Sequence, residues 1–110
     1  MNKINEVKNW RVRCEAKPVK ANADHAILEI YVGSMADEDS REWLRTYAYC
    51  GKGEGFIRVK ARYNEEHNRE VIGDAVLAHH SFPFELLLKR KMVFGSWCVS
   101  ADILDAFALE

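Results

Sequence analysis

A chain of 110 residues with 48% hydrophobic and 30% charged residues has the size and composition of a single globular domain spanning residues 1–110. This balance excludes an intrinsically disordered chain, which has too few hydrophobic residues to form a core. The formal net charge of −1 excludes a uniformly basic protein that is drawn as a whole to nucleic acid or to an anionic membrane.

The chain contains three cysteines that are far apart in the sequence: Cys14, Cys50 and Cys98. Because none belongs to a Cys-x-x-Cys pair, neither a zinc knuckle nor a thioredoxin-like motif is expected. Free cysteines in apolar patterns are typical of small core residues and of a reducing compartment. No apolar run has the length of a signal peptide or of a bilayer span. The sequence therefore predicts a cytoplasmic protein that does not bind membranes.

Alternation of hydrophobic and polar residues predicts a first strand at residues 8–17 and a second at residues 25–32. Pro18 is expected to end the first strand, because proline cannot donate a hydrogen bond to a sheet ladder. The short connection between the two strands favours an antiparallel hairpin.

A helix is expected to begin at Ser34, which has the spacing of a capping box with Asp37, and to end at Gly51. Its first turn is acidic, which complements the positive end of the helix dipole and needs no metal ion. Hydrophobic residues at helical spacing predict that Trp43, with Leu44 and Tyr47, packs on the sheet.

The clearest strand spans residues 56–63, where hydrophobic residues alternate strictly with basic ones. The hydrophobic positions predict a buried face. Every polar position of the exposed face is basic: Arg58, Lys60 and Arg62. The strand is therefore expected to serve both the core and a binding surface.

The second half of the chain predicts a helix over residues 71–80, although its paired hydrophobic residues also suit a strand. Ser81 and Pro83 predict the start of another helix. Residues 92–99, apolar on both faces, indicate an interior strand, and Ser100 is expected to cap a last short helix. The predicted fold is α+β, a single two-layer domain with a mostly antiparallel sheet of about four strands packed by helices, in the order β-β-α-β-α-α-β-α.

Three features are candidate chemical sites, and each has a simpler structural interpretation. The glycine-rich segment 51–55 lacks the spacing of a phosphate-binding loop and follows a helix instead of opening one. His79 and His80 would point about 100° apart on a helix, so they suit a shared metal ion poorly. Cys98 has no local signature of a nucleophile. No catalytic residue, metal ion or cofactor is predicted.

Basic residues on the exposed faces of two strands form the candidate partner-binding site: Arg11, Arg13, Arg58, Lys60 and Arg62. Lys89, Arg90 and Lys91 are candidates to extend it. The alternative is an ordinary exposed sheet face, which is common in antiparallel sheets. Trp10 and Tyr63 lie on the opposite parity of their strands, which disfavours stacking of single-stranded RNA bases on this face.

These patterns predict a small non-catalytic binding protein, such as an inhibitor, an immunity protein, an adaptor or an accessory protein of a phage or mobile element. An acidic protein surface is the expected partner, because the acidic first helix would repel a polyanion. The alternative partner is a nucleic acid bound to the same basic face. A second alternative is a small enzyme that uses His79, His80 and Cys98. The sequence leaves the partner's identity and the oligomeric state open.

Overall fold

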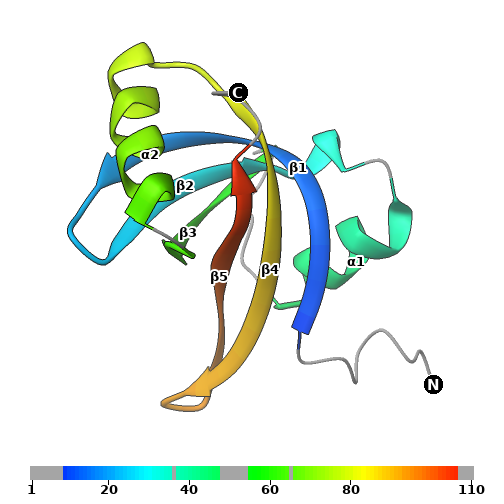
Figure 1. The fold of residues 1–110 in the computed structure, drawn as a ribbon. Helices are drawn as coiled ribbons and strands as arrows, with labels where there is room; N and C mark the ends of the chain where they lie inside the picture. Colours follow the sequence, from blue (N-terminus) through cyan, green and yellow to red (C-terminus); the bar gives the residue numbers. More distant parts are fainter. Residues whose placement is uncertain (1–8, 36, 48–54, 65, 107–110) are drawn as a thin grey trace.

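The computed structural model of the chain describes residues 9–35, 37–47, 55–64 and 66–106. These residues form five strands and two α-helices: β1 (Asn9–Ala21), β2 (His25–Tyr31), α1 (Glu38–Tyr47), β3 (Phe56–Arg62), α2 (Glu66–Ala78), β4 (Phe82–Val93) and β5 (Ser96–Ala106). A short 3₁₀ helix, Val32–Ser34, follows β2. Figure 1 shows the strands curving around one another, with the two helices outside them.

The strands close into a barrel in the order β1-β2-β3-β5-β4. Neighbouring strands are antiparallel except for β3 and β5, which run parallel. That parallel contact is short, with Ala61 opposite Ala101 and Arg62 opposite Asp102. The barrel is therefore closed by antiparallel pairing at every seam except this short parallel one.

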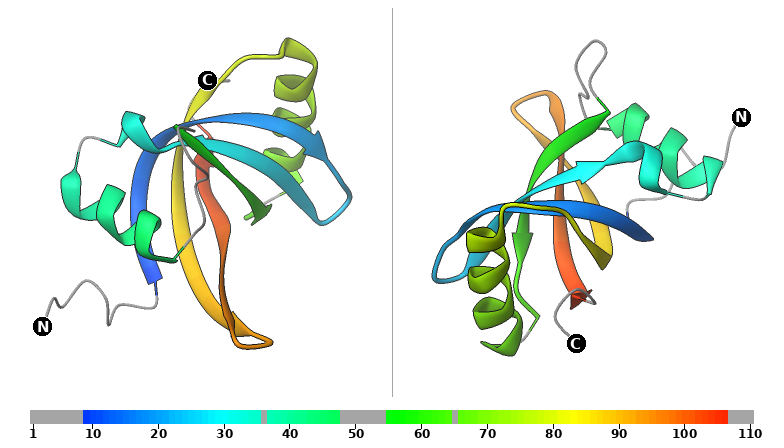
Figure 2. Two further views of the ribbon diagram at one scale, coloured as in Figure 1. Left: turned by 180° about the vertical axis from the view of Figure 1, so that it is seen from behind. Right: turned by 90° about the horizontal axis from the view of Figure 1, so that it is seen from above.

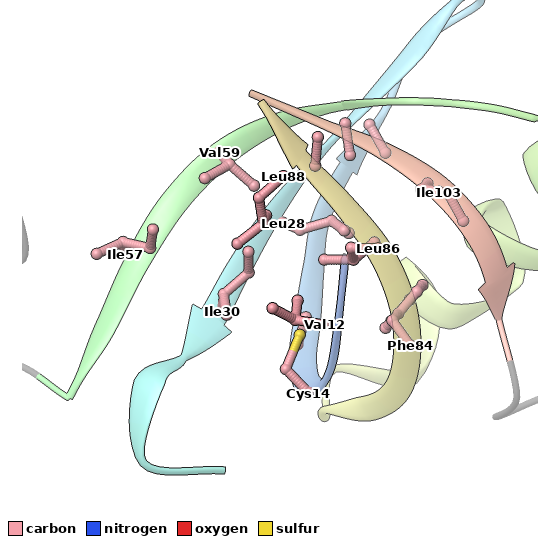
Figure 3. Close-up of a cluster of buried hydrophobic side chains, with 14 of the residues drawn as sticks. Val12, Cys14, Leu28, Ile30, Ile57, Val59, Phe84, Leu86, Leu88 and Ile103 are labelled. Carbon is pink, nitrogen blue, oxygen red and sulfur yellow. The ribbon is translucent and has the colours of Figure 1, made fainter. Parts of the chain in front are cut away.

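The interior of the barrel is filled by the inward-facing residues of every strand. Alternation along β2 buries Ala26, Leu28 and Ile30. Alternation along β3 buries Ile57, Val59 and Ala61. Figure 3 shows these side chains meeting those of β1, β4 and β5. The alternation of hydrophobic and polar residues in the sequence therefore corresponds to side chains inside and outside the barrel.

The helices lie on opposite sides of the barrel (Figure 2). Trp43 and Leu44 of α1 and Ile72 and Ala75 of α2 are buried and belong to the same hydrophobic cluster as the strand residues. The prediction that Trp43 and Leu44 pack against the strands is confirmed. The side chain of Tyr47 lies outside the described residues.

The predicted two-layer α+β fold is wrong, because the second half of the chain contains one helix and two strands where three helices and one strand were expected. Residues 82–93 form a strand: Phe82, Phe84, Leu86 and Leu88 face the core, at a spacing of two. Leu87, on the outer face, extends the hydrophobic run and imitates helical spacing. Pro83 is tolerated because it lies at the start of the strand.

The expected interior strand at residues 92–99 and the expected last helix are also wrong. Phe94 and Gly95 form a two-residue turn between β4 and β5, in which Val93 and Ser96 are paired. The two strands therefore pair with each other as a hairpin. The expected helix after Ser100 is instead the second half of β5, with Ala101 and Ile103 in the core.

Two predicted boundaries in the first half are wrong for local reasons. β1 continues past Pro18, which is buried at a shift of register between Pro18 and Lys20, where the ladder does not need its missing N–H. Ser34 does not cap α1: its hydroxyl donates to the Tyr31 carbonyl oxygen at 2.6 Å and accepts from the Glu15 backbone N–H at 2.8 Å.

Asp37 occupies the capping position of α1 instead. Its carboxylate accepts hydrogen bonds from the Asp39 backbone N–H at 3.2 Å and from the Ser40 hydroxyl at 3.0 Å. The predicted end of this helix at Gly51 lies outside the described residues. The second and third predicted strands are confirmed as β2 and β3. The helix favoured for residues 71–80 is confirmed as far as Ala78, where α2 ends, and α2 begins earlier than predicted, at Glu66.

Candidate functional site

The outer face of β2 and β3 brings together the basic residues predicted on β3. Arg58, Lys60 and Arg62 are exposed and lie opposite Glu29, Ile27 and His25 of β2, respectively. The inward positions of both strands are buried in the barrel, so strand alternation fixes these side chains on the outside.

The second half of β1 adds two further cations to this surface. Lys17 lies opposite Glu29, and Lys20 lies opposite Ile27, on the other edge of β2. Two rows of side chains therefore run across the three strands: Lys17–Glu29–Arg58 and Lys20–Ile27–Lys60. We call this surface the basic face, and define its cations as Lys17, Lys20, Arg58, Lys60 and Arg62.

An aromatic pair borders the basic face. Tyr31 of β2 lies opposite Phe56 of β3, and their ring centroids are 6.0 Å apart at an interplanar angle of 64°. Both side chains are half-buried and share the outer parity of Arg58 and Glu29. An edge-to-face pair is favourable beyond its buried area, and it leaves ring surface available to a ligand.

This pair was not predicted from the sequence, in which Trp10 and Tyr63 were the aromatic residues considered beside the basic positions and have the opposite parity. Phe56 could have been found from its spacing of two from Arg58. The partnership with Tyr31 could not, because it depends on the register between β2 and β3.

One carboxylate lies within the basic face. Glu29 forms an ion pair with Arg58 at 2.6 Å and is mostly covered, with 14% of its side chain exposed against 61% for Arg58. The pair orients the guanidinium across the strands while leaving most of it in contact with solvent. Because Glu29 offsets one cation, the net charge of the face is smaller than its count of basic residues.

A second carboxylate lies at the end of the basic face, in the turn between β1 and β2. The Asp24 carboxylate lies 2.7 Å from the Nδ1 of His25. This hydrogen bond lowers the pKa of Asp24, and the positive charge of Lys60 lowers it further. The Asn22 amide contacts the other ring nitrogen of His25 at 3.0 Å, so the imidazole is held between two partners at the edge of the face.

Arg11 and Arg13 are not part of the basic face. They lie on the first half of β1, which pairs with β4 and not with β2, opposite Leu87 and Glu85. Arg11 forms an ion pair with Glu85 at 2.8 Å, and this hydrogen bond lowers the pKa of the Glu85 carboxyl. The five residues predicted as one site therefore divide between two surfaces. Lys89, a candidate to extend the site, is paired with Asp102 at 2.6 Å.

The residues of the enzyme alternative are not brought together. His79 and His80 follow α2 and precede β4, whereas Cys98 lies opposite Lys91 near the far end of the β4–β5 hairpin. The His80 ring contacts Phe82, with centroids 4.1 Å apart. Within the described ranges, no group of three or more histidine, cysteine, aspartate or glutamate side chains is placed to hold a metal ion.

We expect Cys98 to be alkylated by iodoacetamide in the native protein while Cys14 stays protected. Cys98 is exposed, so the prediction that it is a small core residue is wrong. Burial, together with the negative charge of the neighbouring Glu15, raises the pKa of the Cys14 thiol to about 12, so almost no thiolate is present at neutral pH. Peptide mapping by mass spectrometry measures both sites, with Cys50→Ser as the background. Equal labelling of Cys14 and Cys98 before denaturation would contradict the burial of Cys14.

No family model, curated protein or solved structure matches this chain in sequence or fold. Among the residues that the structure describes, neither helix combines the length and apolarity of a membrane span. Any proposal about function therefore depends on the side chains of the basic face and on general chemistry.

Proposed function

We propose that this protein binds single-stranded nucleic acid along the basic face, through phosphate contacts to its cations and base stacking on Tyr31 and Phe56. The observation that carries the proposal is the juxtaposition of this half-buried aromatic pair with lysine and arginine side chains on the outer faces of β1 and β3. Proteins that bind single strands combine these two elements, a positive surface that follows the backbone and rings on which bases stack.

The two elements play different parts. Lys17, Lys20, Lys60 and Arg62 supply positive charge at which counterions are released when phosphates bind. The edge-to-face geometry of Tyr31 and Phe56 holds two rings at different angles, so one base can stack on one of them without disturbing the pair. A sequence-tolerant mode of binding follows, because every base has a flat face.

The five-stranded barrel supports the same surface by analogy with the OB-fold, which is also a small five-stranded barrel. OB-fold proteins bind oligonucleotides and oligosaccharides on the face of strands 2 and 3. Fold alone does not assign function, and the residues at this face carry the assignment. An uncharged oligosaccharide would not need five cations, which favours a polyanion.

An acidic protein surface is the second candidate partner. It is supported by the ion pair between Arg58 and Glu29, in which the guanidinium and the carboxylate are 2.6 Å apart. This pair shows that a carboxylate can approach the cations of the basic face closely. In both cases we propose a protein that acts by binding and not by catalysis. We also propose a cytoplasmic location, which is supported by the free thiols of Cys14 and Cys98.

Charge reversal on the basic face tests the proposal. We expect Arg58→Glu with Lys60→Glu to weaken binding to a fluorescein-labelled 15-mer of thymidine by at least about tenfold, because attraction to phosphates becomes repulsion. Fluorescence anisotropy at several salt concentrations measures the affinity. The slope of log affinity against log salt should be roughly −2 to −3 for the native protein, which corresponds to three or four neutralised phosphates.

The matched control places the same charge change on the other surface. Arg11→Glu with Arg13→Glu should keep the affinity within about threefold, since these residues lie on the β1–β4 side. Equal losses in both double variants would indicate a non-specific charge effect. Absence of oligonucleotide binding by the native protein would refute this function and leave the acidic protein partner, for which salt should mainly affect the association rate.

A further inference from the structure

The β4–β5 hairpin extends beyond the barrel as a two-stranded ribbon. β1 pairs with β4 only as far as Lys89, and the contact of β3 with β5 is confined to Ala101 and Asp102. From Arg90 to Val99 the two strands pair with each other alone among the described residues. Figure 1 shows this hairpin projecting away from the rest of the barrel.

The tip of the ribbon carries a phenylalanine that is fully exposed, Phe94. Its backbone φ is 48°, and that of Gly95 is 80°. Positive φ at both central residues is the geometry of a type I′ turn, for which Asn-Gly is a preferred sequence. A bulky side chain is rare in this region because its Cβ is crowded there. Phe94 is thus both exposed to water and unfavourable for its own turn, which folding alone does not explain.

Cations follow directly behind the tip. Lys91 is exposed on β4, three residues before Phe94, and Arg90 precedes it, whereas Lys89 is paired with Asp102. Lys91 lies opposite Cys98, which is also exposed, so this section of the ribbon is open to solvent on both strands. An aromatic tip with cations behind it matches the needs of a wedge that enters a base stack while its stem contacts phosphates.

We propose that the hairpin contacts the duplex next to a bound single strand, and that Phe94 inserts against the stacked base pairs at the junction. This inference depends on the function proposed above, in which the single strand lies on the basic face. Insertion of apolar side chains such as phenylalanine between base steps is an established means of gripping a duplex.

The length of the hairpin allows it to contact a duplex while the single strand lies on the basic face. The eight residue-to-residue steps from Phe94 to Asp102 span roughly 26 Å at about 3.3 Å per residue. Asp102 lies opposite Arg62 at the edge of the basic face. The tip is therefore far enough from that face to meet a different part of the same nucleic acid.

Two labelled DNA ligands test the inference: a single-stranded 15-mer of thymidine, and the same 15-mer as an overhang on a 20-base-pair duplex. The native protein should bind the overhang duplex at least about fivefold more tightly than the single strand. Phe94→Asn should abolish this difference and leave single-strand binding unchanged. Phe94→Trp should keep the difference. A 2-aminopurine at the junction should become brighter with the native protein and with Phe94→Trp, but not with Phe94→Asn.

Folding and binding are separable in this experiment. Asparagine suits the turn better than phenylalanine, so Phe94→Asn should melt at the same temperature or higher. If the native protein binds the single strand but shows no preference for the junction, the wedge is refuted and the proposed function stands. If neither DNA binds, both fail. Phe94-dependent binding to anionic vesicles, without any junction preference, would assign the tip to a lipid surface instead.

Discussion

Replacement of Trp43 by alanine is expected to lower the free energy of unfolding by about 3–5 kcal/mol, the range for removal of a large buried aromatic side chain. Trp43 is completely buried between α1 and the barrel. Its ring stacks on that of Trp10 of β1, with centroids 6.3 Å apart at an interplanar angle of 23°. Alanine would leave a cavity at this contact, and α1 would lose its main attachment.

The hydrogen bonds beside this contact make the effect larger than loss of hydrophobic area alone. The Trp10 indole N–H donates to the Ser40 hydroxyl at 2.7 Å, and that hydroxyl donates to the Asp37 carboxylate at 3.0 Å. Ser40 is buried, so water cannot easily replace a lost partner. Displacement of α1 would therefore break its capping interaction as well as its packing.

Unfolding in urea measures this prediction, and a constant denaturant slope would show that only stability has changed. Leu77→Ala is the control, since Leu77 lies on α2 with most of its side chain exposed and should cost less than about 0.5 kcal/mol. A loss below about 1 kcal/mol for Trp43→Ala would contradict the packing of α1 on the barrel.

Alanine at either ring of the aromatic pair is expected to weaken single-strand binding by about 5- to 150-fold, which corresponds to roughly 1–3 kcal/mol per stacked base. The rings of Tyr31 and Phe56 contact each other on the outer side of the sheet, so neither fills the barrel interior. Their replacement should therefore affect binding more than folding.

Conservative variants distinguish stacking from other roles of these residues. Tyr31→Phe retains the ring and should bind within about twofold of the native protein, whereas Tyr31→Leu retains bulk without a flat face and should bind like the alanine variant. Phe94→Asn removes an exposed ring elsewhere and serves as the matched control for binding of the 15-mer. Native affinity in both Tyr31→Ala and Phe56→Ala would exclude base stacking at this face.

Local patterns predicted the first half of the chain better than the second. β2 and β3 follow strict alternation, in which one face is uniformly hydrophobic. In β4, Leu87 interrupts the alternation, and Pro83 after Ser81 imitates the start of a helix. Pairing with β1 along one edge and β5 along the other stabilises residues 82–89 as a strand, and no local pattern contains that information.

The sequence predicted the part of the candidate site that lies on a single strand, β3, and missed the parts that depend on how strands pair. Arg58, Lys60 and Arg62 share one face because alternation along a strand is a local property. Arg11 and Arg13 lie on a different part of the surface from these residues, because β1 changes its neighbour from β4 to β2 near Ala16. That change moves Lys17 and Lys20 onto the basic face.

The sequence by itself determined which residues of β2 and β3 face the core and which face solvent, and that the solvent side of β3 is basic. Both depend only on the geometry of an extended chain. Only the tertiary structure decided that the sheet closes into a barrel, that Tyr31 meets Phe56, and that Phe94 stands at the tip of a projecting hairpin. Each of these results depends on register between strands, which is set by the packing of the whole core.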